Sequence, residues 1–409
     1  MSNDTRPEIR FPGFTEDWEE RKLGEVFQQT VEYIDPKEVG LELWSVTVEN
    51  GLTPKSERYN REFLVKKNDK FKAIHPDEIV YNPMNMTLGS IGFNNSGKNV
   101  AVSGYYVTMK LNKGFDSKYF AAWLPSPNAI NLYKLYATGS LIERQRVQFP
   151  TLSGIKTLMP ILNEQKQIGL FFKQLDDTIA LHQRKLDLLK ETKKGFLQKM
   201  FPKNGAKVPE IRFPGFTGDW EQRKLGELAE SFEYGLNASA KKFDGSNKYI
   251  RITDIDDINH KFNQNGVTSP DIDFANADNY KLKKGDILFA RTGASVGKTY
   301  MYRESDGLVY YAGFLIRARI KSKISSEFVF QTTFTDSYNQ FIKITSQRSG
   351  QPGVNAEEYS NFKIMIPNYE EQDAIGCFFK QLDDTIALHQ RELDVLKETK
   401  KGFLQKMFV

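Results

Sequence analysis

The stretch FFKQLDDTIALHQ occurs at Phe171–Gln183 and again, letter for letter, at Phe378–Gln390. The repeat extends over the 31-residue windows Phe171–Phe201 and Phe378–Phe408, which differ at only two positions. Apolar residues recur in each window at alternating steps of four and three, and a polar face lies between them. This spacing over more than four heptads predicts a long helix that forms a coiled coil.

A second repeat precedes the helices and is named the marker here. It covers Pro7–Glu25 and Pro209–Glu227, and 17 of its 19 residues are identical. The chain therefore reads as marker, domain and helix, twice over. The expected parts are an N-terminal segment (1–17), a first head (18–160), a first helix (161–201), a linker with the second marker (202–217), a second head (218–367) and a second helix (368–409).

Each predicted helix is roughly 55 Å long at 1.5 Å per residue, and the obvious partner of each is the other. Asn163 and Asn368 are the expected N-caps. We expect His182 and His389 to set the register of the apolar seam rather than to act in catalysis. The residues expected to form the seam and to take part in partner docking are Ile168, Phe172, Leu175, Ile179, His182, Leu186, Ile375, Phe379, Leu382, Ile386, His389 and Leu393.

Bulk properties narrow the class of protein. With 409 residues, 39% of them hydrophobic, the chain can build two packed domains, and its net charge of +5 alone says little about partners. Cys377 is the only cysteine, which excludes an intrachain disulfide and favours a reducing compartment. Because no signal peptide or membrane span is visible, we expect a cytoplasmic protein without membrane contact.

The two heads share a sequence skeleton. Asp77–Phe93 and Gly285–Met301 each contain an acidic residue, a strand-like run, a polar loop and a Ser-apolar-Gly turn, so that Ser90–Gly92 is paired with Ser295–Gly297. Short β-rich runs between Gly, Asn and Pro predict α+β domains. The loop side chains differ almost everywhere. This pattern predicts that the two heads share one fold and present two different contact surfaces.

Catalytic signatures are incomplete. GASVGKT at Gly293–Thr299 is one residue short of a phosphate loop, and NPMN at Asn82–Asn85 lacks the rest of an amino-methyltransferase site. Glu-x-Lys pairs on the copied helices indicate solvated charges, and the four histidines lack metal-ligand spacing. We therefore expect no catalytic residue, metal or cofactor in this chain.

Binding chemistry remains, because basic and amide side chains gather in Gly/Ser-rich loops of both heads. Such side chains contact phosphates and read base edges. The candidate DNA-binding residues are Asn82, Met84, Asn85, Ser90, Thr138, Ser140, Arg144, Arg146, Lys241, Lys242, Arg291, Thr292, Ser295, Lys298, Arg348, Ser349, Gln351 and Asn355. Two other hypotheses stay open: a coiled-coil adaptor whose heads bind proteins, and a nucleotide hydrolase built on Gly293–Thr299.

The chain resembles the DNA-specificity subunit of type I restriction–modification systems. The resemblance rests on GDILFARTGASVGK (Gly285–Lys298), DEIVYNPMN (Asp77–Asn85), SGQPGVN (Ser349–Asn355), and a Pro…Glu-Gln…Ile run that opens both helices. The order of parts and their duplication extend it over essentially the whole chain. The first head departs from the pattern, because ATGSLIERQR stands where SGQPGVN is expected.

The resemblance implies a non-catalytic subunit with two target-recognition domains separated by an antiparallel pair of long helices in a pseudo-twofold, circular arrangement. Each domain would read one half of a split, asymmetric site in double-stranded DNA. The helices would seat two methyltransferase subunits that use S-adenosylmethionine, and restriction subunits would add translocation and cleavage with ATP and Mg²⁺. By pseudo-symmetry, Phe11 is expected near Met407 and Phe408, and Phe213 where the first helix meets the second head.

Overall fold

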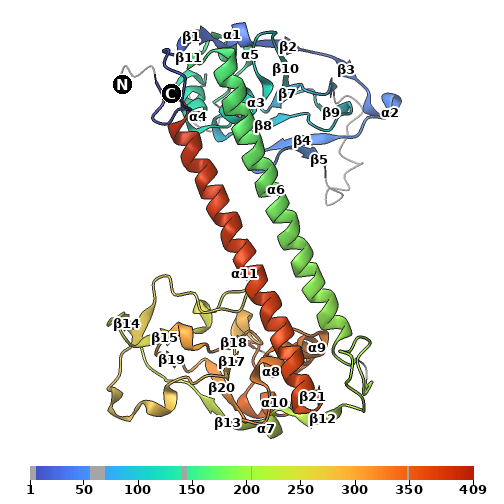
Figure 1. Ribbon diagram of the computed structural model, residues 1–409, viewed down its shortest axis with the longest axis vertical. Helices are drawn as coiled ribbons and strands as arrows, with labels where there is room; N and C mark the ends of the chain where they lie inside the picture. Colours follow the sequence, from blue (N-terminus) through green and yellow to red (C-terminus); the bar gives the residue numbers. More distant parts are fainter. Residues whose placement is uncertain (1–5, 56–69, 140–144, 204, 348–349) are drawn as a thin grey trace. The chain divides into compact units, whose positions relative to one another are not determined.

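The structure, a computed structural model, describes residues 6–55, 70–139, 145–203, 205–347 and 350–409. It divides into two compact units (Figure 1). The first unit comprises Met1–Gln183 and Arg391–Val409, and the second comprises Arg184–Gln390. Each unit therefore contains one head and a part of each long helix.

The first head combines short strands with short helices. Its strands are β1 (Glu19–Lys22), β2 (Phe27–Thr30), β3 (Tyr33–Ile34), β4 (Trp44–Thr47), β5 (Gly51–Pro54), β6 (Phe71–Ile74), β7 (Ile79–Tyr81), β8 (Ile91–Phe93), β9 (Val100–Ser103), β10 (Val107–Leu111) and β11 (Lys156–Met159). Its helices are α1 (Leu23–Val26), α2 (Pro36–Val39), α3 (Ser117–Trp123), α4 (Pro127–Tyr136), α5 (Phe149–Gly154) and the 3-10 turn η3 (Met86–Leu88).

An antiparallel sheet of order β2-β10-β7-β8 forms the centre of this head, and the sheets β3-β6-β9, β4-β5 and β1-β11 lie around it. The strand β7 is buried at all three positions, which explains its uninterrupted apolar sequence IVY. Tyr119, Phe120 and Trp123 of α3 and Tyr133 of α4 pack into the same core as the central sheet. This core makes the sheet a rigid support for the loops at its ends.

The second head is built in the same way. Its strands are β12 (Glu221–Lys224), β13 (Ala229–Tyr234), β14 (Ala240–Lys242), β15 (Lys248–Ile250), β16 (Thr268–Pro270), β17 (Asp286–Ala290), β18 (Thr299–Met301), β19 (Val309–Tyr311), β20 (Leu315–Ile320) and β21 (Lys363–Ile366). Its helices are α7 (Leu225–Leu228), α8 (Ser326–Thr332), α9 (Asp336–Thr345), α10 (Ala356–Ser360) and the 3-10 turns η5 (Ile252–Asp254), η6 (Phe274–Asn276), η7 (Asp278–Tyr280), η8 (Gly293–Ser295) and η9 (Glu304–Asp306).

Strand register aligns the β7–β8 hairpin of the first head with the β17–β18 hairpin of the second, residue by residue. The central sheet of the second head has the order β13-β20-β17-β18, matching β2-β10-β7-β8. Ile79 pairs with Phe93 in the first head, and Ile287 pairs with Met301 in the second. The loops between these strands therefore have the same length, and each position in one loop has a counterpart in the other.

This alignment corrects one sequence-based pairing. Pairing Ser90–Gly92 with Ser295–Gly297 was wrong, because the strand register places Gly89 opposite Gly297 and Ser90 opposite Lys298. Gly89 and Gly297 both have left-handed backbone, with φ of 94° and 85°. The position that needs left-handed backbone, rather than the letters Ser-x-Gly, is the shared feature of the turn.

Each unit contains an antiparallel stretch of the two long helices, α6 (Leu162–Lys199) and α11 (Tyr369–Lys406). In the first unit Phe171 lies against Phe403, with ring centres 5.1 Å apart. In the second unit Phe196 lies against Phe378, also at 5.1 Å. An early residue of one helix thus meets a late residue of the other within each unit, as the family resemblance implied.

The residues predicted to form the seam on α6 and α11 are all buried or half-buried. Both helices continue through their late glycines, Gly195 and Gly402.

Within the described part of the chain, no helix is both long and apolar enough to cross a membrane.

The two helix starts differ from the sequence expectation at one cap. The side chain of Asn368 accepts a hydrogen bond from the amide of Glu371 (2.9 Å) and caps α11 as predicted. Asn163 as a cap was wrong, because α6 begins at Leu162 and Asn163 lies inside it. What the two starts share is a glutamine: the side-chain amides of Gln165 and Gln372 each donate to the carbonyl of the preceding proline at 2.8 Å.

The markers clamp the helix starts. Arg10 forms a two-pronged ion pair with Glu164 (2.7 and 2.8 Å), and Arg212 forms the same pair with Glu371 (2.7 and 2.6 Å). Both glutamate side chains are 0% exposed. This contact explains why the same marker precedes both heads: each helix start carries a buried carboxylate that needs an arginine.

The markers also contact the helix ends, as predicted. The amide of Ile9 donates to Lys406 of α11 at 2.9 Å. Phe11 packs against the core that contains Met407 and Phe408. In the second unit Phe213 packs in the corresponding position, with its ring centre 5.8 Å from that of Phe378.

Candidate nucleic-acid interface

In the second head, two loops proposed from sequence for DNA contact lie side by side. The β17–β18 loop and the segment before α10 form an antiparallel bridge at Thr292 and Gly353. The carbonyl of Arg291 accepts from the amide of Val354 at 2.9 Å, and the amide of Gly293 donates to Pro352 at 3.0 Å. Residues separated by about sixty positions in sequence thus share one surface at the end of the central sheet.

Two buried tyrosines support this surface. The hydroxyl of Tyr359 donates to the carbonyl of Ala290 (2.7 Å), and that of Tyr338 donates to the carbonyl of Gly297 (2.9 Å). Burial raises the pKa of both hydroxyls well above the ordinary value. Both therefore stay protonated donors at neutral pH, and the loop is held at its two ends.

The first head contains a counterpart of this loop pairing, although its sequence does not indicate one. The amide of Val147 donates to the carbonyl of Pro83 at 3.0 Å, which repeats the contact between Val354 and Arg291. Thr138 and Arg146 form an antiparallel bridge just before it. Gln145–Val147 (QRV) therefore takes the structural place of Pro352–Val354 (PGV).

The candidate side chains differ in their accessibility. Met84, Asn85, Thr138, Arg146 and Gln351 are exposed. Asn82, Arg291, Thr292 and Ser295 are partly exposed. Ser140, Arg144, Arg348 and Ser349 lie outside the described residues.

Three candidates already have structural roles. Ser90 is buried, and its hydroxyl donates to the carbonyl of Val46. Lys298 is largely buried, binds the carbonyl of Ile255 (3.2 Å) and forms an ion pair with Asp257. The hydrogen bond from Lys298 holds the pKa of the Asp257 carboxyl below its usual range. Asn355 is exposed but uses its side chain to cap α10.

Lys241 and Lys242 belong to a different sheet. Both lie on β14, in the sheet of order β14-β16-β15-β19. Lys242 is exposed, and Lys241 lies 3.5 Å from the carboxylate of Asp271. The structure therefore does not group these lysines with the paired loops on the central sheet.

The geometry also rejects the phosphate-loop hypothesis for Gly293–Thr299. A phosphate loop leads from a strand into a helix whose first amides hold the phosphates. Here the loop contains the short turn η8 and leads into the strand β18. Its lysine is Lys298, which is engaged with Asp257 and Ile255.

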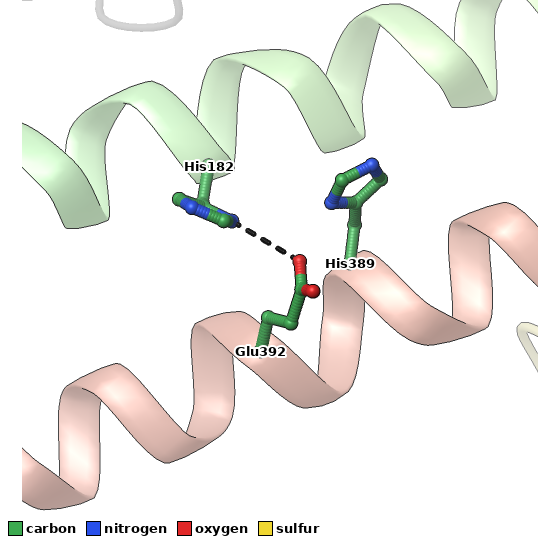
Figure 2. A group of neighbouring side chains, drawn as sticks. All are labelled: His182, His389 and Glu392. Atoms are coloured by element: carbon green, nitrogen blue, oxygen red, sulfur yellow. Dashed lines mark ion pairs between the residues drawn. The ribbon is translucent and has the colours of Figure 1, made fainter.

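On α6 and α11, one of the two differences between the copied windows creates a contact. Glu392 of α11 stands where α6 has Lys185. Its carboxylate lies 3.5 Å from Nδ1 of His182, and both residues belong to the first unit (Figure 2). A seam histidine with a carboxylate beside it agrees with a structural, register-setting role.

The profile of the type I restriction modification DNA specificity domain matches residues 15–191 and 217–398. This chain belongs to that family. The two matched segments correspond to its two heads with parts of the helix that follows each. The family is one of DNA-recognition subunits, so the function of the chain is DNA recognition for a type I restriction–modification system.

Similar proteins agree with this membership. The type I restriction enzyme MjaVIII specificity subunit of Methanocaldococcus jannaschii is 25% identical over 405 residues, covering 95% of this chain and 91% of that protein. A putative MjaX specificity subunit of the same organism is 24% identical over 67% of this chain and 63% of that protein.

Solved structures agree in fold. The S subunit of a type I restriction–modification system from M. genitalium superposes with a TM-score of 0.66 at 14% identity, covering 99% of both chains. A chain from a structural study of type I restriction–modification complex assembly gives a TM-score of 0.52 at 15% identity, covering 98% of both.

For a specificity subunit, two further residues of the second head are relevant that sequence analysis did not single out. The rings of Tyr234, the last residue of β13, and Phe314, just before β20, both lie close to the guanidinium of Arg291. A sequence signal existed for one of them, because Phe314 lies in the aromatic run YYAGFL that precedes a strand. Its position beside Arg291 depends on strand pairing, which the run itself does not reveal.

Proposed function

We propose that each head reads one half of a bipartite, asymmetric site in double-stranded DNA, and that the two helices seat two methyltransferase subunits. The observation that carries the proposal is the contrast between scaffold and loops. The β7–β8 and β17–β18 hairpins of the two central sheets align residue by residue, yet the exposed loop residues at matched positions differ in chemistry. Two heads that share one fold but present different side chains are suited to recognising two different half-sites.

The Asn82–Ser90 and Thr138–Arg146 loops would read the first half-site. The Arg291–Lys298 loop and the Arg348–Asn355 segment would read the second. Support comes from the loop pairing in each head, which presents residues from both segments on one surface. Ser90, Lys298 and Asn355 would act by holding these loops rather than by touching bases, because their polar groups are already engaged.

Docking of two copies of one partner is supported by the exposed face of the helices. A coiled coil constrains its seam, whereas exposed positions are free to drift. Leu181 and Leu388 occupy equivalent exposed positions and are identical, as are most of their exposed neighbours. Because the two helices present the same exposed residues, each can bind one copy of the same partner subunit.

In this proposal the chain itself holds no cofactor. S-adenosylmethionine would belong to the methyltransferase subunits, and ATP and Mg²⁺ to restriction subunits that join the complex. The chain would contribute recognition and assembly to adenine methylation and to DNA cleavage by those partners.

The test is single-molecule methylome sequencing of cells that carry this chain with its methyltransferase subunit, compared with cells lacking the chain. We expect methylated adenines in a split motif with a constant spacer. A continuous motif, or no change in methylation, would contradict the proposal. In vitro, the log of the DNA-binding constant should fall steeply with log salt, by about 0.9 per phosphate neutralised. An adaptor that binds only proteins would show no such dependence.

A further inference from the structure

The side chain of Arg291 stands out among the arginines of the second head. Its guanidinium carbon lies 5.0 Å from the centre of the Tyr234 ring and 5.9 Å from that of Phe314. Its Nε is buried and has no hydrogen-bond partner among the residues that the structure describes. The guanidinium is therefore held by two aromatic rings rather than by an acidic group.

The other arginines described in this head are paired with carboxylates. The paired residues are Arg223, Arg251, Arg303, Arg317 and Arg319. Among the described residues of the head, no such partner accompanies Arg291. A guanidinium stacked on rings keeps its terminal N–H groups available, and it is positioned at a much smaller cost in side-chain entropy than a freely moving arginine.

The first head presents side chains at the positions that correspond to the two rings. Strand register places Tyr105 at the position of Phe314 and Val31 at that of Tyr234. All four are exposed, at 42% for Tyr105, 57% for Phe314, 53% for Val31 and 42% for Tyr234. Large apolar side chains left in solvent at matched places of two diverged surfaces indicate a shared contact.

The residue next to these two positions differs between the heads. Pro83 takes the place of Arg291, because its carbonyl accepts from Val147 as that of Arg291 does from Val354. Pro83 is buried and has no polar side chain. The two heads thus share the two apolar positions and differ in whether a guanidinium lies beside them.

We propose that Arg291 reads a guanine in the second half-site, and that Tyr234 and Phe314 are positioning residues that hold its guanidinium towards the base edge. This inference rests on the proposed reading of a half-site by each head. Guanine presents O6 and N7 in the major groove, and an arginine fork matches both acceptors. Of the bases, guanine alone offers two adjacent acceptors there, so an arginine in this setting selects it.

The experiment measures adenine methylation by the full chain assembled with its methyltransferase subunits, on DNA libraries in which each base pair of both half-sites is varied. Wild type is expected to require a G·C pair at one position of the second half-site. Arg291→Ala and Arg291→Lys should both reduce discrimination at that position on the order of 10- to 100-fold, with every other position unchanged. Lysine keeps the charge but lacks the fork, so its failure separates base reading from phosphate contact.

The ring variants test the positioning role. Phe314→Leu and Tyr234→Leu should relax the same position, whereas Phe314→Tyr and Tyr234→Phe, which retain a ring, should keep it. The matched control is Tyr105→Leu, which should alter methylation only through the first half-site. Because Phe314 is exposed, its replacement should leave folding and assembly intact, and the melting temperature of each complex verifies this.

Three outcomes would overturn the inference while leaving the proposed function standing. They are an equal loss for all bases in Arg291→Ala, full rescue by Arg291→Lys, or a second half-site without a required G·C pair. If wild type methylates no split site at all, the proposed function fails and the inference with it.

Discussion

At the scale of single residues, buried polar contacts decide more than surface charge. Glu164 and Glu371 are fully buried and each depends on one arginine of a marker. By contrast, pairs such as Arg223 with Glu227 are half exposed and 3.5 Å apart. A carboxylate in the interior cannot regain water when its partner is removed, so the two kinds of ion pair should respond differently to substitution.

The first prediction follows from this contrast. Arg212→Ala leaves the Glu371 carboxylate buried without its cation and should lower the free energy of unfolding by about 3–5 kcal/mol. Arg223→Ala is the matched control and should cost no more than about 0.5 kcal/mol. Urea titrations of both full-length variants provide the measurement. Equal, small effects from the two substitutions would show that the marker arginine is not a clamp.

A second residue-scale prediction concerns pH. His260 has positive φ (55°), and its Nδ1 lies 2.8 Å from the carbonyl of Thr299. Burial lowers the pKa of its imidazole, and the charges of Lys193 and Lys298 lower it further, while the Thr299 carbonyl and Asp256 act in the opposite direction.

Since the folded-state pKa is depressed, the unfolded chain binds the proton more readily. The stability from neutral His260 is therefore complete above the unfolded pKa of about 6.5 and is lost as pH falls below it, at no more than about 1.4 kcal/mol per pH unit. His260→Asn tolerates the positive φ and can still donate to Thr299. Urea titrations at pH 7.5 and 5.5 should show a smaller loss on acidification for the variant than for wild type. Parallel losses would rule out His260 as a source of the pH dependence.

At the scale of elements, reciprocal ion pairs accompany the apolar seam. Lys193 of α6 lies 2.6 Å from Asp383 of α11 in the second unit, and Lys400 of α11 pairs with Asp176 of α6 at 2.5 Å in the first. The pairs join equivalent positions with the helices exchanged, 207 residues apart in each case. Such contacts favour antiparallel neighbours in this register, because a shift by one heptad would separate both pairs of opposite charges.

The third prediction uses a charge exchange at one of these pairs. Lys193→Asp places two carboxylates together and should lower the free energy of unfolding by about 1–3 kcal/mol, between the values for exposed and buried pairs. Adding Asp383→Lys should restore most of it. The lysine introduced at position 383 would also face Gln331, whose Nε2 donates to Asp383 in the native chain. The Oε1 of Gln331 is buried and has no partner among the described residues. Additive losses in the double variant, measured by urea titration, would deny a direct pair.

At the scale of the whole molecule, the two ends of the chain belong to one folded unit. The amide of Ile9 donates to the carbonyl of Lys406, and Lys406 reaches the Glu8 carboxylate at 2.6 Å. The second unit repeats the backbone contact between Ile211 and Lys199, but there the chain runs on from helix to marker. The end of α6 is thus joined to the second marker through the chain itself, whereas the end of α11 meets the first marker only through non-covalent contacts.

The fourth prediction is a circular permutant. Joining the termini by a short flexible linker and reopening the chain between Lys203 and Ala206 exchanges these two roles. The permutant should fold, assemble with methyltransferase subunits and methylate the same site as wild type. The control opens the chain inside α6 at Gln183, which breaks a helix instead of a connection and should prevent assembly. A Lys203–Ala206 permutant that cannot assemble would contradict the equivalence of the two connections.

Much of this architecture can be predicted from the sequence, because it depends on local patterns. Helical periodicity is a local property, so the 4-3 steps from Ile168 and from Ile375 already indicate two seams. Duplication is visible as identity, and the order of marker, head and helix carries the family resemblance. The loops of the second head could also be chosen in advance, because Gly, Ser, Arg and Gln gather at Arg291–Lys298 and Ser349–Asn355.

What only the tertiary structure decided depends on contacts between distant residues. Arg10 and Glu164 are 154 positions apart, and nothing near either residue announces the pair. The equivalence of Pro83 with Arg291 appears only through hydrogen bonds to Val147 and Val354, since the loop letters have diverged. Backbone hydrogen bonds and burial constrain shape without constraining side-chain identity, so the loops kept their pairing while their sequences changed. For the same reason the sequence marked Lys298 as a candidate for DNA contact, whereas the fold surrounds it with partners.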